Sequence, residues 1–137
     1  MRPVYNNLDR LHRPSMQGRR KVATVRAGNL YGSLEMLILR GLELCGPMHG
    51  VGVADHIGSR SDGLFRVEEG SLYPALHRLQ AKGLVDWEWR KTEEGKRAKF
   101  YQITRKGHRA LSGELERWVA STRAMLSLLE VPIAEVT

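Results

Sequence analysis

Residues 67–89 read VEEGSLYPALHRLQAKGLVDWEW, and the rest of the fold can be worked out from this stretch. Its first part predicts a helix over about 70–82, because Leu72, Leu76 and Leu79 recur at spacings of four and three. Such spacing places the three leucines on one buried stripe. The predicted helix therefore packs along one side and keeps a polar side free.

The ends of this helix are marked by residues that commonly begin and end helices. We expect Ser71 to cap its N-terminus, with Pro74 in the first turn, where backbone N–H groups have no partner within the helix. Gly83 is typical of the residue just after a helix C-terminus. The positions away from the leucine stripe carry hydrogen-bond donors, namely Ser71, Tyr73, His77, Arg78 and Lys82.

Two strands joined by a charged loop follow the helix. Val85, Trp87 and Trp89 alternate with polar residues, which is the period of a half-buried strand. A second alternating run includes Tyr101 and Ile103. The polar connection between the runs, over about 91–98, predicts a hairpin. Its outer end carries four cations and two acids, namely Lys91, Lys96, Arg97, Lys99, Glu93 and Glu94.

Apolar spacing and helix boundary residues place the remaining elements. We expect helices over about 31–45 and 49–61, and a long helix from a Thr104 cap to about residue 130. A short strand fits about 64–67. Three short helices, a hairpin and a long helix form the plan of a winged helix-turn-helix. The predicted fold class is mainly α with a small β-hairpin, that is α+β.

The distribution of charge separates the N-terminal segment from the rest. The chain has 137 residues and a net charge of +7. Residues 1–28 hold seven basic side chains and one acidic side chain, a net charge of +6, so the remainder is nearly neutral. A basic segment of this kind favours a polyanionic partner, either nucleic acid or an anionic membrane surface. We interpret it as a flexible arm, and a solubilising tail is the alternative.

The long C-terminal helix carries a heptad seam that predicts dimerisation. Its apolar positions are spaced four, three, four, three and four residues apart. A small winged core cannot cover a helix of this length, so we expect a second copy of the chain to cover it. Packing of the seam on the chain's own helix at 31–45 is the alternative. The predicted seam comprises Leu111, Leu115, Trp118, Thr122, Met125 and Leu129. The domain prediction is a basic arm (1–28), a winged helix-turn-helix (29–104), a dimerisation helix (105–131) and a tail (132–137).

Three stretches together carry a resemblance to a known family. They are GSLEMLILRGLELCGPMHGVGVADHI at 32–57, VEEGSLYPALHRLQAKGLVDWEW at 67–89 and RAKFYQITRKG at 97–107. In these stretches the chain resembles the PadR family of bacterial transcriptional regulators. It looks most like a short subgroup called Acidobacterial PadR, which has a single C-terminal helix. The family often has Tyr where this chain has Val51, which weakens any contact assigned there.

The resemblance implies a homodimeric repressor that binds a palindromic operator in double-stranded DNA and is released by a small molecule. It places the helix at 70–82 in the major groove, and the wing on phosphates. Trp118 is the candidate contact for a small aromatic effector, and an ordinary tryptophan of the dimer core is the alternative. The candidate DNA contacts are Ser71, Tyr73, Pro74, His77, Arg78, Lys82, Lys96, Arg97 and Lys99.

Other functional classes lack their motifs. The sequence has no Gly-rich phosphate loop, no HExxH and no CxxC, so we expect neither an enzyme nor a cofactor. Cys45, His49 and His56 are close in sequence, but Gly46-Pro47 separates the first two, so we expect no metal site. No apolar run approaches the roughly 20 residues of a membrane span. With a single cysteine and no signal-like segment, we expect a cytoplasmic protein with no membrane partner.

Three questions stay open at this point. Tyr73 could pack under the wing rather than face DNA. The whole domain could be a protein-interaction or architectural module with only non-specific DNA affinity. Arg78 could read a guanine edge or bind a phosphate, and the sequence does not choose between them.

Overall fold

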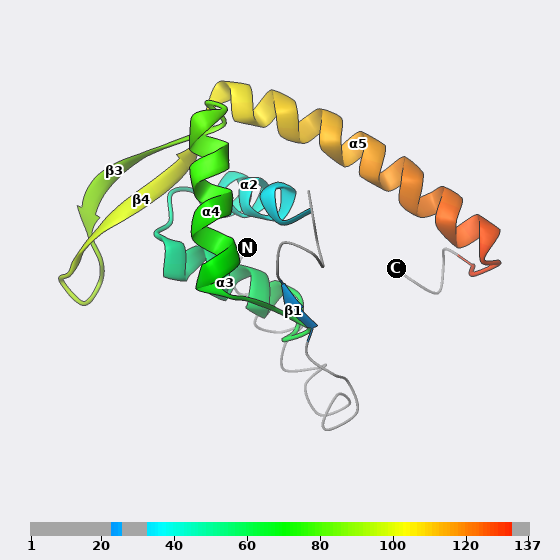
Figure 1. The fold of residues 1–137 in the computed structure, drawn as a ribbon, viewed down its shortest axis with the longest axis horizontal. Helices are drawn as coiled ribbons and strands as arrows, with labels where there is room; N and C mark the ends of the chain where they lie inside the picture. The colour runs from blue at the N-terminus through cyan, green and yellow to red at the C-terminus, as the bar shows by residue number, and fades with distance from the viewer. Residues whose placement is uncertain (1–22, 26–32, 133–137) are drawn as a thin grey trace.

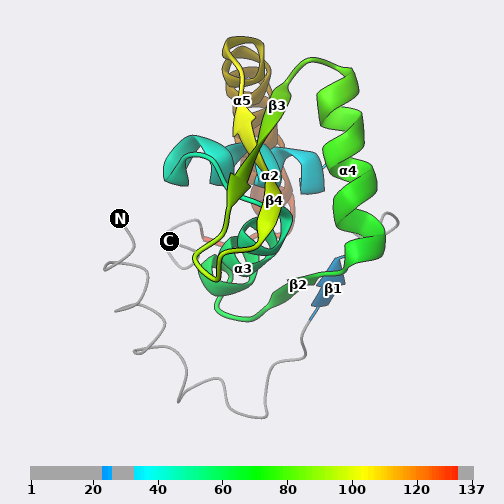
Figure 2. The ribbon, with the colours of Figure 1, turned by 90° about the vertical axis from the view of Figure 1, so that its left-hand side faces the viewer.

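The computed structural model describes residues 23–25 and 33–132 of the chain. Figure 1 shows α2, α3 and α4 gathered beside the β3–β4 hairpin, with α5 leaving the group as a long arm. Figure 2 shows the hairpin in front of α2, with α4 on one side of it. In order, the elements are β1 (Ala23–Val25), α2 (Ser33–Cys45), α3 (Gly50–Arg60), β2 (Phe65–Val67), α4 (Glu69–Ala81), β3 (Val85–Lys91), β4 (Arg97–Ile103) and α5 (Arg105–Leu128).

This arrangement confirms the predicted α+β class and the winged helix-turn-helix followed by a long helix. The predicted helices and strands all occur, with ends that differ by at most three residues. None of the helices in the described ranges is both long enough and apolar enough to cross a membrane.

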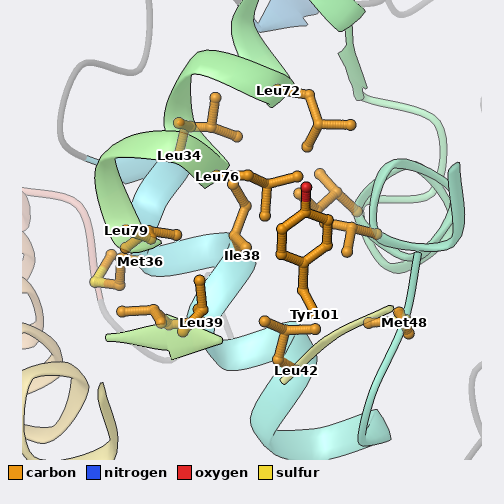
Figure 3. Close-up of a cluster of buried hydrophobic side chains, with 14 of the residues drawn as sticks. Leu34, Met36, Ile38, Leu39, Leu42, Met48, Leu72, Leu76, Leu79 and Tyr101 are labelled. Carbon is orange, nitrogen blue, oxygen red and sulfur yellow. The ribbon is translucent and has the colours of Figure 1, made fainter. Parts of the chain in front are cut away.

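A single cluster of aliphatic side chains holds the helices and the hairpin together. The leucine stripe of α4 is fully buried, and α2 supplies Ile38 and Leu42 to the same cluster. Tyr101 of β4 enters from the hairpin, as Figure 3 shows. Burying one such aliphatic side chain stabilises a fold by about 1.5–3 kcal/mol, so this cluster dominates the stability of the domain.

The hairpin is fixed to the helices at its inner end. Trp87 pairs with Tyr101 and Trp89 with Lys99 in the antiparallel register. Met48, in the turn between α2 and α3, pairs with Tyr101 through two backbone hydrogen bonds of 3.1 and 2.8 Å. The inner half of the hairpin is therefore part of the core, and the outer half extends past it as a wing (Figure 2).

Part of the predicted N-terminal arm has regular structure. Ala23–Val25 forms β1, which pairs in parallel with β2 from Phe65 to Val67. The predicted flexible arm over 1–28 therefore includes a short strand at these three residues. The spacing of apolar residues gave no sign of β1, because a three-residue strand is too short to show a period. The rest of the arm, and residues 133–137 of the predicted tail, lie outside the described residues.

The start of α4 differs from the prediction. The helix begins at Glu69 with Glu68 as its N-cap, and no side chain caps it. Ser71 is instead a buried residue of the first turn, so its predicted capping role is wrong. Pro74 lies in the second turn and not the first, and it is exposed. Gly83 ends the helix with φ of +77°, as predicted.

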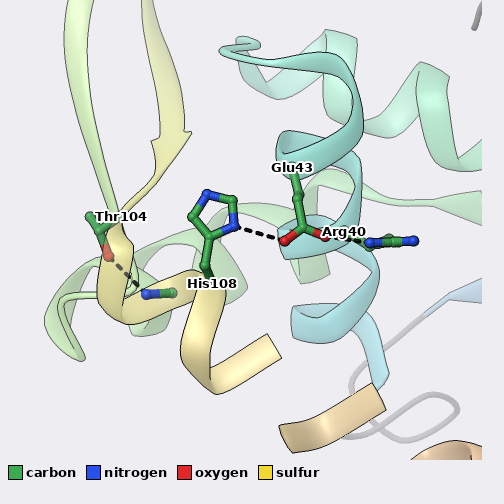
Figure 4. A network of polar contacts seen from close by, with 5 residues as sticks. Arg40, Glu43, Thr104 and His108 are labelled. Atoms are coloured by element: carbon green, nitrogen blue, oxygen red, sulfur yellow. Dashed lines mark hydrogen bonds and ion pairs between the residues drawn. The ribbon is translucent and has the colours of Figure 1, made fainter. Parts of the chain in front are cut away.

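The start of α5 is capped as predicted, and α5 then runs antiparallel to α2. The Thr104 side chain accepts a 3.0 Å hydrogen bond from the Gly107 backbone N–H (Figure 4). One turn later, His108 Nδ1 lies 2.7 Å from Glu43 Oε2 near the end of α2. Trp118 then donates a 3.4 Å hydrogen bond to Ser33 at the start of α2. The C-terminal part of α5 extends beyond α2 (Figure 1).

Candidate nucleic-acid interface

Helix α4 presents a narrow outward face between the elements that hold it. Its inner face is formed by five buried residues, Ser71, Leu72, Ala75, Leu76 and Leu79. Opposite them, Tyr73, Pro74 and His77 are exposed. Among the predicted contacts on α4, these three and Arg78 are exposed. Ser71 is 9% exposed, so its side chain belongs to the core and not to this face.

Tyr73 lies against the first turn of α3 and also faces outward. A Cβ atom added to Gly50 would be 2.5 Å from the Tyr73 hydroxyl oxygen, so only glycine leaves room for this phenol. Tyr73 nevertheless keeps 37% of its surface exposed. Burial raises the pKa of the Tyr101 hydroxyl, and the electrostatic interaction with Tyr73 raises it further. Tyr73 thus connects α4 to the first turn of α3.

The two basic residues of α4 that we predicted as DNA contacts are bound within the protein. Arg78 Nε donates a 2.7 Å hydrogen bond to Glu35 Oε2, and Lys82 Nζ donates a 3.0 Å hydrogen bond to Glu35 Oε1. Glu35 belongs to the first turn of α2. Arg78 and Lys82 therefore lie on the flank of α4 next to α2, away from the flank that carries Tyr73.

One face of the wing combines tryptophan with cations. The register places Lys91 opposite Arg97 and Trp89 opposite Lys99, and paired residues of an antiparallel ladder share a face. The Arg97 guanidinium carbon lies 4.7 Å from the centre of the Trp89 ring, and Lys99 Nζ lies 4.3 Å from that of Trp87. Both distances are within the range of cation–π attraction. The indoles hold two of the predicted phosphate contacts in place.

The other face of the wing is mixed in charge and turns toward α3. Arg90 on this face is paired with Glu88 at 2.5 Å, and Phe100 stacks on His49 with 5.2 Å between ring centres. A groove of about 550 Å³ between the wing and α3 has Glu93 and Glu94 in its lining. Acidic side chains disfavour phosphate, so the tryptophan face is the better match to DNA. Lys96 is exposed at the wing tip between the two faces.

The predicted seam of α5 divides into a covered half and an exposed half. Leu111 is buried, and Leu115 packs against the core of the same chain. Trp118 and Met125 are 49% and 57% exposed, and Leu129, just after the helix, is exposed as well. Thr122 is partly exposed. The first half of the seam thus packs on α2, and the second half has no apolar cover in the described part of the chain.

The metal-ligand candidates do not gather into a site. Cys45 Sγ lies 3.5 Å from His56 Nδ1, so these two are in contact across the turn between α2 and α3. His49 is instead stacked on Phe100. Within the described residues, no group of three or more His, Cys, Asp or Glu side chains could hold a metal ion.

Two features of this surface were not predicted from the sequence. Trp89 was assigned to the strand pattern alone, although its position opposite Lys99 in a hairpin would have placed it beside the basic side chains of the wing. Glu35 gave no signal, because its partner Arg78 is 43 residues away in the sequence. Pairs so far apart can be found only once the fold brings their helices together.

Comparisons with known proteins agree with this geometry. Residues 38–113, more than half of the chain, match the model of the transcriptional regulator PadR-like family. An uncharacterized protein of Lysinibacillus sphaericus is 30% identical over 94 residues, which cover 69% of this chain and 85% of that protein.

Solved structures show the same likeness. A PadR-like transcriptional regulator from Bacillus cereus superposes with a TM-score of 0.65 at 27% identity, over 75% of this chain and 97% of that one. A PadR family transcriptional regulator from Eggerthella lenta gives a TM-score of 0.60 at 30% identity, over 74% and 85% of the two chains. By its sequence and its fold, the chain belongs to the PadR-like family of transcriptional regulators.

Proposed function

We propose that this protein is a sequence-specific, homodimeric repressor that binds a palindromic operator through α4 and the wing. The observation that carries the proposal is the surface formed by the outward face of α4 and the tryptophan face of the wing. A helix of this kind fits the major groove of B-DNA, which is about 12 Å wide.

In the proposed complex, side chains from the N-terminal half of α4 contact the bases. Tyr73 and His77 carry hydrogen-bond groups for base edges or phosphates, and Pro74 offers an apolar surface for a thymine methyl group. Gln80, exposed on the same helix, is a further candidate because glutamine pairs with adenine. Arg78 and Lys82 contact DNA only by giving up their bonds to Glu35.

The wing supplies the proposed backbone contacts. Lys96, Arg97 and Lys99 bind phosphates beside the major groove, and Arg97 and Lys99 approach from the tryptophan face. The basic residues of the N-terminal arm add affinity that does not depend on sequence. The domain boundaries predicted from the sequence, with α5 as the dimerisation helix, remain part of this proposal.

The proposed dimer forms through the exposed half of α5. Trp118, Met125 and Leu129 are large apolar groups left open to solvent, and a second copy of the chain would bury them. A two-fold dimer presents two α4 helices to successive major-groove half-sites, which accounts for a palindromic operator.

A small aromatic effector is proposed to bind beside Trp118. This indole is half exposed and anchored to α2 through its N–H, so a planar molecule can stack on it at the dimer interface. Fluorescence titration tests the idea, with Trp118→Phe as the control for signal from Trp87 and Trp89. If the Trp118→Phe protein is quenched as strongly as the wild type, the effector does not bind there.

The decisive test of DNA binding is fluorescence anisotropy at two salt concentrations. One duplex carries the DNA upstream of the protein's own gene, and a second carries the same bases scrambled. A specific regulator holds the native duplex at the higher salt concentration after the scrambled duplex has dissociated. Equal and salt-sensitive binding to both would favour an architectural or protein-binding module.

A further inference from the structure

Glu35 neutralises two cations of the helix proposed to read DNA. Its side chain is only 18% exposed, whereas the side chains of Arg78 and Lys82 are 49% and 56% exposed. Each carboxylate oxygen accepts a hydrogen bond from one of the two cations. Burial alone would raise the pKa of Glu35, but the hydrogen bonds and charges of Arg78 and Lys82 lower it below 4.5. Glu35 is therefore ionised at neutral pH.

The position of the pair on α4 makes it relevant to DNA. Ser71, Ala75 and Leu79 belong to the buried face of α4, and Arg78 and Lys82 border that face on the side of α2. A helix lying in the major groove has a phosphate backbone along each of its flanks. Long side chains that start from a flank and are half exposed can turn from Glu35 to a phosphate.

A phosphate and a carboxylate compete for the same donors, because both are anions that accept hydrogen bonds from Arg and Lys. Sequence-independent affinity for DNA comes almost entirely from such phosphate contacts. The useful quantity for a regulator is the ratio of specific to non-specific affinity. A carboxylate that keeps two cations bound within the protein lowers the affinity for non-operator DNA.

We infer that Glu35 is a specificity-determining residue: it competes with DNA phosphates for Arg78 and Lys82 and so suppresses binding to non-operator DNA. This inference rests on the proposed DNA-binding function. It requires no operator sequence, because it concerns binding to arbitrary DNA.

The test measures the affinity of the full chain for a 30-base-pair duplex of arbitrary sequence, by anisotropy between 50 and 200 mM salt. Glu35→Gln should bind more tightly than wild type, with a log–log salt slope steeper by roughly 1 to 2, because each phosphate contact adds about 0.9. Glu43→Gln is the matched control, since it removes a carboxylate from the same helix and frees Arg40 and His108, which lie away from α4. It should leave the slope nearly unchanged.

A double-mutant cycle separates competition from a purely structural role. Replacing Arg78 and Lys82 together by Gln should cost little affinity when Glu35 is present and several-fold more in the Glu35→Gln protein. If Glu35→Gln fails to fold, the Arg78→Gln, Lys82→Gln protein is compared with the wild type instead. A salt slope shallower than that of the wild type by about 2 would mean that both cations already bind phosphates while Glu35 is present, which contradicts the inference.

Different results would contradict the role of Glu35 and the proposed function. Equal slopes for Glu35→Gln and Glu43→Gln, or an additive cycle, would overturn the role of Glu35 while leaving DNA binding intact. Absence of binding by the wild-type protein to every duplex at 50 mM salt would overturn the proposed function as well.

Discussion

At the scale of single residues, Gly50 sets the position of Tyr73. The Tyr73 ring fills the space where any other residue would place its Cβ, with ring atoms 2.9 Å from that point. The phenol is at the end of a partly exposed side chain, so it can swing away at little cost to the fold. Gly50 therefore matters more for the position of Tyr73 on the proposed DNA-binding surface than for stability.

We predict that Gly50→Ala weakens operator binding by about 1–3 kcal/mol, the usual value of one base contact, because Tyr73 is displaced. Its free energy of unfolding should change by less than about 1 kcal/mol, since alanine favours a helix over glycine. Anisotropy and thermal melting measure the two effects. Tyr73→Phe is the companion variant, and if neither protein loses affinity then the phenol makes no contact with DNA.

The residues of the site differed in how far the sequence could place them. The apolar period of α4 predicted its buried and outward sides, so Tyr73, Pro74 and His77 were placed outward from the pattern alone. Ser71 was misplaced because serine is common both as a cap and inside a first turn, and the actual start at Glu69 decided between the two. The ion pairs of Glu35 depend on packing between α2 and α4, which no local pattern reports.

At the scale of elements, the wing depends on its two tryptophans to hold its cations. Trp89 is 49% exposed. Its ring makes edge contact with Trp87 at 5.5 Å and carries Arg97 on its face. We expect the indole to orient the guanidinium toward the phosphates before DNA arrives.

Trp89→Ala should reduce affinity for both native and scrambled duplexes by about two- to five-fold, which corresponds to the 0.5–1 kcal/mol of an exposed cation–π contact. Trp89→Phe should keep part of this affinity, because phenylalanine retains a ring face. Anisotropy at one low salt concentration compares the three proteins. A loss confined to the native duplex would mean instead that Trp89 contacts a particular base step.

Helix α2 joins the other elements through two carboxylates, Glu35 to α4 and Glu43 to α5. Burial tends to raise the pKa of each, but their cationic partners lower both pKa values below the usual 4.5. A carboxyl group with a lower pKa in the folded state stabilises that state above pH 4.5. The contribution is lost as the pH falls through the folded-state pKa.

The wild-type melting temperature should therefore drop more steeply between pH 5 and pH 3 than that of a Glu35→Gln, Glu43→Gln protein. At pH 7 the wild type should be the more stable of the two proteins, and this difference should shrink as the pH falls through the folded-state pKa values. Circular dichroism melts at several pH values check this. Parallel curves for the two proteins would show that neither carboxylate contributes to acid sensitivity.

At the scale of the whole molecule, the heptad spacing of α5 correctly predicts a helix, but it does not show which residues bury the apolar stripe of that helix. Leu111 and Leu115 contact the core of their own chain, because α5 lies antiparallel on α2. The C-terminal part of α5 extends beyond α2, and Trp118, Met125 and Leu128 on it are exposed. A sequence period reports that a stripe is buried and not which chain buries it, so the structure was needed to divide the seam.

This division selects the variant that tests dimerisation. A charge at Leu115 would disturb the core of the monomer, whereas Met125 is 57% exposed and lies on the open half. We predict that Met125→Glu changes the wild-type dimer, of twice the 15.5 kDa chain mass, to a folded monomer in light scattering. Ala124→Glu adds the same charge one residue away, on the side of α5 opposite the seam, and should remain dimeric.

The loss of the dimer should also change how the protein binds DNA. A monomer contacts one half-site, so Met125→Glu should lose most of its preference for the native duplex while keeping salt-sensitive affinity for any duplex. The two-fold pairing of half-sites, and not α4 alone, then supplies most of the discrimination. If the Met125→Glu protein stays dimeric and keeps its preference, the partner surface lies elsewhere, and the exposed half of α5 must be covered by something other than a second copy of this chain.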